Sequence, residues 1–279
     1  MPVAYKDMSE RKIVKKSTEP VTLEILKKDL YKIGLREGMI VLLHSSLSSI
    51  GWVCGGAVTV ILALESMLGP EGTLIMPSHS GDLSDPKEWI NPPVPKSWWD
   101  SIRNTMPPYE RDLTPASGMG VIPEVFRKQK GVLRSSHPQV SFIARGKYAK
   151  HITANHSLEF GCGEKSPLKR IYDLGGYILL LGVNHSSNTS IHLAENRAYY
   201  PKKKIITCGA PIIINKERKW IEFKDYEDYV DDFVEIGKDF IKNRRNSINL
   251  GFIGQAESQL FKQKDIVDFA VEWIEKNRK

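Results

Sequence analysis

The chain has 279 residues, of which 41% are hydrophobic and 26% charged, and a formal net charge of +7. These proportions are those of an ordinary globular protein and exclude a largely disordered chain, while no run of about 18 to 20 apolar residues predicts a membrane span. Residues 1–16 lack the apolar core of a signal peptide, and the three cysteines have no CxxC spacing. We therefore expect a cytoplasmic protein without a disulfide framework or a structural zinc site.

The first third of the chain carries the pattern of a parallel crossover. Residues 22–32 have helical spacing of leucines, and 39–43 form a short apolar run typical of a buried strand. After a polar loop rich in serine and glycine, 57–68 again reads as a helix, and 73–76 as the next strand. A strand, loop, helix and strand in this order are the signature of a βαβ unit.

Residues 78–114 lack regular periodicity but hold three of the six tryptophans, Trp89, Trp98 and Trp99. Long segments without periodicity inside a compact domain are usually functional loops or disordered, and disordered segments are poor in tryptophan. We expect a lid-like insert; an ordered loop that only covers the core is the alternative.

The rest of the chain alternates between short helices and strands and then becomes antiparallel and helical. The predicted elements are a helix over 118–128, a strand over 140–144, helices over 147–154 and 168–172, a strand from 177, a hairpin over 205–214 and 219–223, and helices over 226–242 and 264–276. We predict an α/β fold: a single domain over 1–279 with a mixed, largely parallel central sheet flanked by helices, the insert, and a C-terminal α+β elaboration.

The most informative stretch is 177–195, where an apolar strand leads through a polar loop to a helix start that carries His192 and Glu195. Residues three apart share a helix face, so an imidazole and a carboxylate would lie one turn apart at the carboxyl end of a strand. A carboxylate beside a histidine fixes its tautomer and stabilises the imidazolium, which suits a general base. The simpler explanation is that His192 and Glu195 are polar surface residues or cap the start of the helix.

Two further loops suit an anionic ligand. One is HSSLSS, over 44–49, and the other is TPASGMG, over 114–120; both offer hydroxyls and free amides beside glycines that permit close approach. Neither GxxxxGK[ST], GxGxxG nor GxSxG occurs, so a Walker loop, a dinucleotide fingerprint and a serine hydrolase elbow are not indicated. Basic residues are scattered without a nucleic-acid module, so an anionic small molecule is a more economical partner than nucleic acid.

Two weaker clusters are RSSHP, with His137, and GCGEKSP, with Glu164. A histidine before proline is more often a loop residue bonded to the backbone than a catalyst, and an isolated glutamate is more often an ion-pair partner.

Taken together, the order and spelling of these motifs resemble the aminoglycoside 3-N-acetyltransferase family, the acetyl-CoA-dependent enzymes outside the GNAT fold, and its bacillus-type members in particular. The matching segments are VLLHSSLSSIGWVCGGA, GTLIMPS, TPASGMG, RSSHPQVSFIARG, GCGEKSPL and LLLGVNHSSNTSIHLAE.

The resemblance implies acetyl-CoA as cosubstrate, no metal, and a monomer or homodimer that acts on an amine without nucleic-acid or membrane partners. It implies His192 as the catalytic base with Glu164 and Glu195 near it, and it does not decide which carboxylate orients the histidine. Asp82, Trp98 and Glu164 would contact the substrate. The implied coenzyme-binding residues are His44, Ser45, Ser46, Leu47, Ser48, Met76, Ser117, Met119 and Gly120.

The chemistry agrees with this assignment. An amino-sugar amine is largely protonated at neutral pH, so a base must take a proton as the nitrogen attacks the thioester. His192 could do so by direct transfer, and Ser45 or Ser46 could donate to the developing oxyanion. An acetyl-cysteine intermediate is less favoured because no Cys/His signature occurs.

Three alternatives remain open at this point. The nearest keeps the acetyl donor and acetylates another small amine metabolite. The second is a non-catalytic nucleotide- or polyanion-binding protein, which only the basic charge favours. The third is a metal hydrolase using His185, His192 and Glu195, although no established ligand spacing is met.

Overall fold

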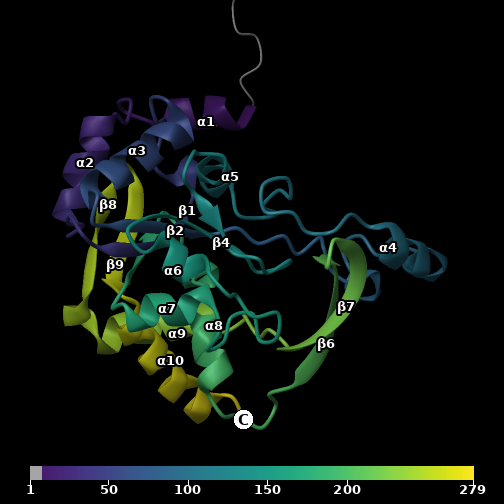
Figure 1. Cartoon of the computed structure of the whole chain (residues 1–279). Helices are drawn as coiled ribbons and strands as arrows, with labels where there is room; N and C mark the ends of the chain where they lie inside the picture. Colours follow the sequence, from purple (N-terminus) through teal and green to yellow (C-terminus); the bar gives the residue numbers. More distant parts are fainter. Residues whose placement is uncertain (1–7) are drawn as a thin grey trace, which may run out of the picture.

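In the computed structural model, which describes residues 8–279, a central sheet of seven strands runs through the molecule (Figure 1). Its spatial order is β3-β4-β2-β1-β5-β9-β8. The strands are β1 Ile40–Ser45, β2 Thr73–Pro77, β3 Leu133–Arg134, β4 Phe142–Gly146, β5 Tyr177–Leu181, β8 Ile248–Ile253 and β9 Ala256–Lys262.

The pairing in this sheet is mixed, as predicted, but its parallel part is confined to the centre. Strand β1 pairs in parallel with β2 and with β5, whereas β4, β3, β9 and β8 join by antiparallel pairing. The expectation of a largely parallel sheet is therefore corrected. The β8–β9 hairpin, closed by the two residues Gly254 and Gln255, was not anticipated and supplies one antiparallel edge.

Helices cover both faces of the sheet, which explains why β1 is apolar without alternation. Ile40 and Leu42 face one core cluster, and Val41 and Leu43 face the other. One layer holds α2 Leu23–Lys32, α3 Gly56–Leu68 and α5 Val121–Arg127; the opposite layer holds α6 Ala149–Thr153, α7 Pro167–Asp173, α8 Ser190–Arg197, α9 Phe233–Asn243 and α10 Gln263–Asn277.

These bounds agree with the predicted helices to within two residues, apart from two later starts. The helix expected from residue 118 begins at Val121, and the one expected from 226 begins at Phe233. In each case the residues before the helix form a loop. As shown below, both loops lie beside the candidate site.

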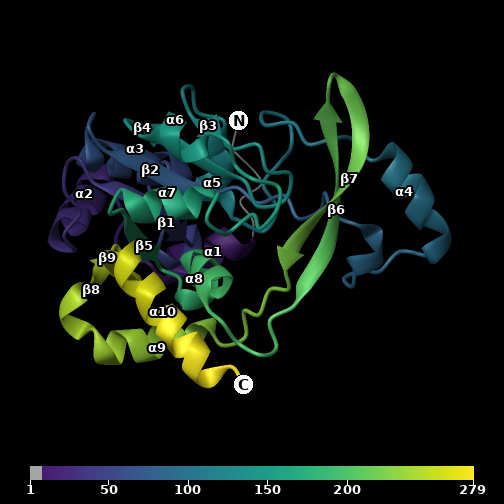
Figure 2. The same cartoon turned by 60° about the horizontal axis from the view of Figure 1, so that its bottom comes forward.

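A long hairpin, β6 Ile205–Ile214 and β7 Glu217–Tyr226, projects from the body of the molecule (Figure 2). Its turn is Asn215 and Lys216, both with positive φ, so β7 begins two residues earlier than predicted.

The insert over 78–114 contains α4 Trp99–Thr105, which both views place on the far side of this hairpin from the sheet. The Tyr109 amide donates to the Pro211 carbonyl at 3.1 Å, and Arg218 Nε donates to the Met106 carbonyl at 2.8 Å. The insert thus packs along the hairpin.

Arg134, in the RSSHP segment, holds the two ends of the insert together. Its buried guanidinium donates to the carbonyls of Ser78 at 2.7 Å and Arg111 at 3.1 Å, to that of Thr114, and to Ser141 Oγ at 2.9 Å. This motif therefore has a structural role.

No helix within residues 8–279 combines the length and the apolar character needed to cross a bilayer.

Candidate functional site

A cavity of about 720 Å³ lies at the carboxyl ends of the central parallel strands. It brings together segments far apart in the sequence: the loop after β1, the glycine-rich loop before α5, and the first turn of α8. Eight of the residues singled out from the sequence line it: His44, Ser45, Ser46, Leu47, Ser48, Met119, Gly120 and His192.

The serine loop forms this wall through a short 3₁₀ turn over Leu47–Ser49. Ser46 Oγ lies 2.9 Å from Ser49 Oγ and 3.2 Å from Ser48 Oγ. Helix α3 starts only at Gly56 and does not line the cavity, so the serine loop presents no helix N-terminus to a ligand there. Its donors are the serine hydroxyls, since the amides of Ser46 and Ser49 already donate to the carbonyls of Leu181 and Ser46.

His44, at the end of β1, is buried and stays neutral. Burial, with a smaller contribution from the charge of His185, lowers the pKa of His44 to about 3. Its Nε2 atom lies 3.4 Å from Thr189 Oγ1, which links the end of β1 to the start of α8. The residue can position neighbours or ligand but cannot act as an acid at neutral pH.

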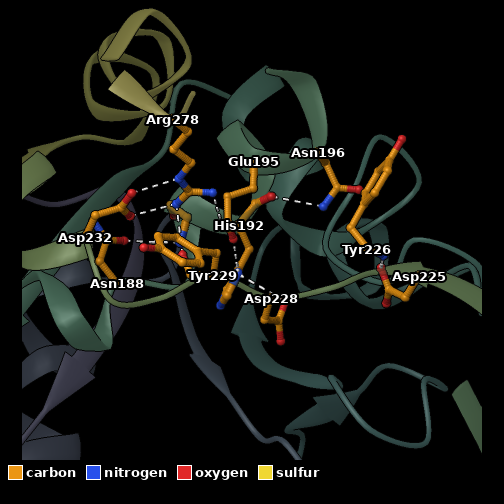
Figure 3. Close-up of polar contacts among 11 residues, drawn as sticks. Asn188, His192, Glu195, Asn196, Asp225, Tyr226, Asp228, Tyr229, Asp232 and Arg278 are labelled. Atoms are coloured by element: carbon orange, nitrogen blue, oxygen red, sulfur yellow. Dashed lines mark hydrogen bonds and ion pairs between the residues drawn. The ribbon is translucent and has the colours of Figure 1, made fainter. Parts of the chain in front are cut away.

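His192 is the titratable group suited to catalysis. It occupies the first turn of α8, its side chain is 15% exposed, and its Nδ1 lies 2.7 Å from Glu195 Oε2 and 3.5 Å from Asp228 Oδ1 (Figure 3). Burial lowers the pKa of His192, but the hydrogen bond to Glu195 and the charges of Asp228, Glu195 and Asp225 outweigh it and raise the pKa above 6.5. Because Nδ1 faces the carboxylates, Nε2 is the nitrogen left for a substrate.

Glu195 is only 3% exposed, and Arg278 compensates its charge. Arg278 Nη1 donates to Glu195 Oε1 at 2.6 Å, while its Nε and Nη2 donate to the two oxygens of Asp232 at 2.8 and 2.7 Å. The sequence left open which carboxylate contacts His192; in the structure it is Glu195.

Glu164 lies elsewhere, contrary to its predicted place beside the histidine. It is exposed and pairs with Arg197 Nε at 2.6 Å. It borders a second cavity of about 370 Å³ together with Asn196 and Tyr226. Glu164 is therefore an ion-pair partner, which was the simpler interpretation of the sequence.

Four other predicted residues do not line the main cavity. Met76 is fully buried in the core on the α3 side of the sheet, because the alternation of β2 turns it inward. Ser117 precedes the lining residues and donates its amide to the His79 carbonyl at 2.8 Å. Asp82 and Trp98 belong to the insert, and Trp98 is 57% exposed.

His79, two residues after the end of β2, was not singled out from the sequence. It lines the cavity, and its Nε2 is buried without a hydrogen-bond partner in the described part of the chain. Burial first, and then the charge of His192, lower the pKa of His79 to about 3. The ring is a neutral group with unused hydrogen-bonding capacity. The sequence feature that could have identified His79 is the polar run PSHS at the end of a predicted strand.

His137 is a loop residue bonded to the backbone, the simpler of the two interpretations of the sequence. Its Nδ1 accepts the amides of Gln139 and Val140, and its Nε2 lies 3.1 Å from the Leu158 carbonyl. Burial lowers the pKa of His137 to about 4. Both nitrogens are therefore occupied by the backbone.

None of the three cysteines lines the main cavity. Cys162 is buried in the core, and burial raises the pKa of its thiol well above 9. The ligand atoms of His192, Glu195 and Asp228 lie within 4.8 Å of one another. A cation there would displace the His192 hydrogen bond and face the positive charge of Arg278, so the three groups do not suit a metal ion.

Comparison with known proteins gives a family match over residues 42–275, to the model described as aminoglycoside 3-N-acetyltransferase. The SPbeta prophage-derived aminoglycoside N(3')-acetyltransferase-like protein YokD of Bacillus subtilis is 49% identical, covering 96% of this chain and 97% of its own. Aminoglycoside N(3)-acetyltransferase VII of Streptomyces paromomycinus is 36% identical, covering 96% of each chain.

Solved structures of similar proteins also cover nearly the whole chain. The crystal structure of YokD superposes with a TM-score of 0.93, covering 96% of this chain and 98% of that one, at 49% identity. AAC-IIIb, in a binary complex with CoASH, gives 0.82 at 30% identity, covering 93% and 98% of the two chains. AAC-VIa bound to sisomicin gives 0.83 at 28% identity, covering 93% and 99%.

Proposed function

The chain belongs to the aminoglycoside 3-N-acetyltransferase family, and we propose that it moves the acetyl group of acetyl-CoA to the 3-amino group of the 2-deoxystreptamine ring, with His192 as general base. The observation that carries the proposal is the position of His192. It lines the same cavity as the serine loop, with Nδ1 held by Glu195 and Nε2 left for a proton.

In the proposed reaction the acceptor nitrogen attacks the thioester carbonyl carbon. The C–N bond forms, the amine proton passes to His192 Nε2, and the C–S bond breaks. The proton then goes to the departing sulfur, which gives CoASH and the amide. Glu195 accepts from Nδ1–H throughout and stabilises the imidazolium that forms, which agrees with the raised pKa of His192.

The coenzyme side of the cavity is proposed to be the serine loop and the glycine-rich loop. Side-chain hydroxyls of Ser46 and Ser48 and the uncrowded positions of Gly118 and Gly120 can receive a polar chain, since a Cβ atom built at either glycine meets nothing within 4 Å. The AAC-IIIb structure with CoASH supports coenzyme A as the occupant.

Two neutral groups at the cavity wall suit the developing oxyanion. Ser45 Oγ and His79 Nε2 are both buried without a partner among residues 8–279. A buried donor left free in the empty enzyme is available to a transition-state oxygen without reorganisation.

The acceptor is proposed to approach from the side of Asp228, whose side chain is 75% exposed while its Oδ1 lies 3.5 Å from His192 Nδ1. A carboxylate open to solvent beside the base can hold a neighbouring ammonium group of a polycation. The sisomicin complex of AAC-VIa supports an aminoglycoside acceptor.

Thiol release with acetyl-CoA tests the proposal, with kanamycin, gentamicin and sisomicin compared against simple non-sugar diamines. NMR of the purified product then identifies the acetylated nitrogen. We expect turnover only with 2-deoxystreptamine compounds and acetylation at the 3-amino group. Turnover confined to the non-sugar amines, or modification of another nitrogen, would refute it.

A further inference from the structure

We propose that Arg278 is a positioning residue for the acetyl transfer: it fixes the Glu195 carboxylate that orients His192. The role assigned to His192 rests on the function proposed above, whereas the orienting effect of Arg278 can be measured without substrate. Arg278 directly follows α10 and reaches the active site only through the fold, since 83 positions separate it from Glu195.

The guanidinium uses its donors on three different partners (Figure 3). Besides Glu195 at 2.6 Å and the two oxygens of Asp232, its Nη2 donates to the Tyr229 carbonyl at 2.8 Å. The group lies over the rings of Tyr229 and Tyr200, at 4.8 and 5.2 Å from their centroids. Arg278 is 8% exposed, so this arrangement is shielded from water.

The first consequence concerns Glu195. Its two oxygens have separate tasks: Oε2 faces His192 Nδ1, and Oε1 accepts from Arg278. A buried carboxylate held at one oxygen only could rotate about its last torsion and would lack a counter-charge, which is costly in a buried position. Arg278 removes that freedom, and with it the freedom of the imidazole to turn.

The second consequence concerns the loop before α9. Asp232 and Tyr229 lie on this loop, and so does Asp228, the other carboxylate within reach of His192 Nδ1. By clamping the loop, Arg278 keeps Asp228 at 3.5 Å while Glu195 stays at 2.7 Å. Without the clamp, Nδ1 would exchange between two carboxylates and Nε2 would lose its fixed direction.

The opposing explanation is that Arg278 only fastens α10 to the protein. A matched control for that role is Trp273→Phe. Trp273 borders the same cavity as Arg278, and its Nε1 donates to Asp239 Oδ2 at 2.8 Å, a hydrogen bond that joins α10 to α9 and includes neither Glu195 nor Asp232. Trp273→Phe and Arg278→Met should both lower Tm. Only the positioning role predicts that Arg278→Met also changes the hydrogen bond of His192.

A cavity of about 600 Å³ lined by Arg278, Asp232 and Tyr229 allows a further test. In Arg278→Ala, added guanidinium can enter this space and bridge the vacated carboxylates. Ammonium, a point charge without the planar fork, should do so less well.

The experiment compares the native enzyme, Arg278→Met, Arg278→Ala and Trp273→Phe at a temperature where all are folded. Proton and ¹⁵N NMR, assigned with His192→Gln, should show a hydrogen-bonded Nδ1–H of His192 in the native enzyme and Trp273→Phe, and its loss in Arg278→Met. With aminoglycoside, Arg278→Met should lose roughly 10- to 100-fold in kcat, with the acetyl-CoA KM within about twofold. Guanidinium should restore part of the kcat of Arg278→Ala.

An unchanged His192 resonance in Arg278→Met, or a kcat loss no greater than that of Trp273→Phe, would overturn the positioning role. If the native enzyme acetylates no aminoglycoside, the proposed function fails and the NMR comparison still decides the role of Arg278.

Discussion

The Nδ1 atom of His192 lies 2.7 Å from Oε2 of Glu195, one turn further along α8. This contact assigns the two ring nitrogens different tasks, because the one bound to the carboxylate keeps its proton and the other keeps its lone pair.

Replacing Glu195 by Gln should lower the pKa of His192, since the negative charge that raises it is lost and an amide oxygen is a weaker acceptor for Nδ1–H than a carboxylate. The base must be neutral, so kcat/KM rises as pH increases through the pKa of His192. In Glu195→Gln this rise should therefore move to lower pH, while the plateau falls. The pH profile of kcat/KM measures both changes. Glu164→Gln, which alters the exposed partner of Arg197, is the matched control and should keep the native profile; the reverse result would make Glu164 the orienting carboxylate.

Ser46→Trp should fill the cavity between the serine loop and the glycine-rich loop. We expect the Kd for acetyl-CoA to rise by about 10-fold or more, which corresponds to at least about 1.4 kcal/mol. Isothermal titration calorimetry is the measurement. Val58→Trp, which adds the same ring on an exposed face of α3, is the control. Equal Kd values for the two variants would place the coenzyme elsewhere.

Trp98→Ala tests whether the insert acts as a lid. Because Trp98 lies outside the main cavity and the insert packs along the β6–β7 hairpin, we expect the KM values of acetyl-CoA and of the aminoglycoside to stay within about twofold of native. Steady-state kinetics with each substrate varied will show this. A selective rise in the aminoglycoside KM would restore the lid interpretation drawn from the sequence.

Arg134→Met should destabilise the protein by about 3 kcal/mol, because it removes the hydrogen bonds to three carbonyls at the ends of the insert, that of buried Ser78 among them. Urea-induced unfolding measures the change. Arg145→Met removes an exposed ion pair with Glu65 and should cost no more than about 1 kcal/mol. A similar small loss in both variants would argue against Arg134 as an anchor.

The sequence predicted best what lies close along the chain. His192 and Glu195 share one helix face, and the apolar run of β1 identified a strand covered on both sides, so local spacing was sufficient. The position of the serine loop was also foreseeable, because it follows β1, whose carboxyl end meets that of β5 at one edge of the sheet.

What the sequence could not supply are contacts that only the fold creates. Arg278 and Asp228 reach His192 from outside its own helix, and no spacing rule connects them. Glu164 is close to α8 in space, but its carboxylate pairs with Arg197 and not with His192. Met76 was placed at the cavity because of its motif, although strand alternation turns it into the core and leaves His79, three residues on, at the cavity wall.

The central claim, that His192 is the base for transfer from acetyl-CoA, is tested most directly by His192→Gln. The variant should bind acetyl-CoA with a Kd within about threefold of native while its kcat with an aminoglycoside falls by roughly 10² to 10⁴, the usual contribution of a positioned base. Calorimetry and thiol release on one preparation give both values. A histidine base would titrate between about pH 6 and 9. A near-native kcat of the variant throughout that range would contradict the account.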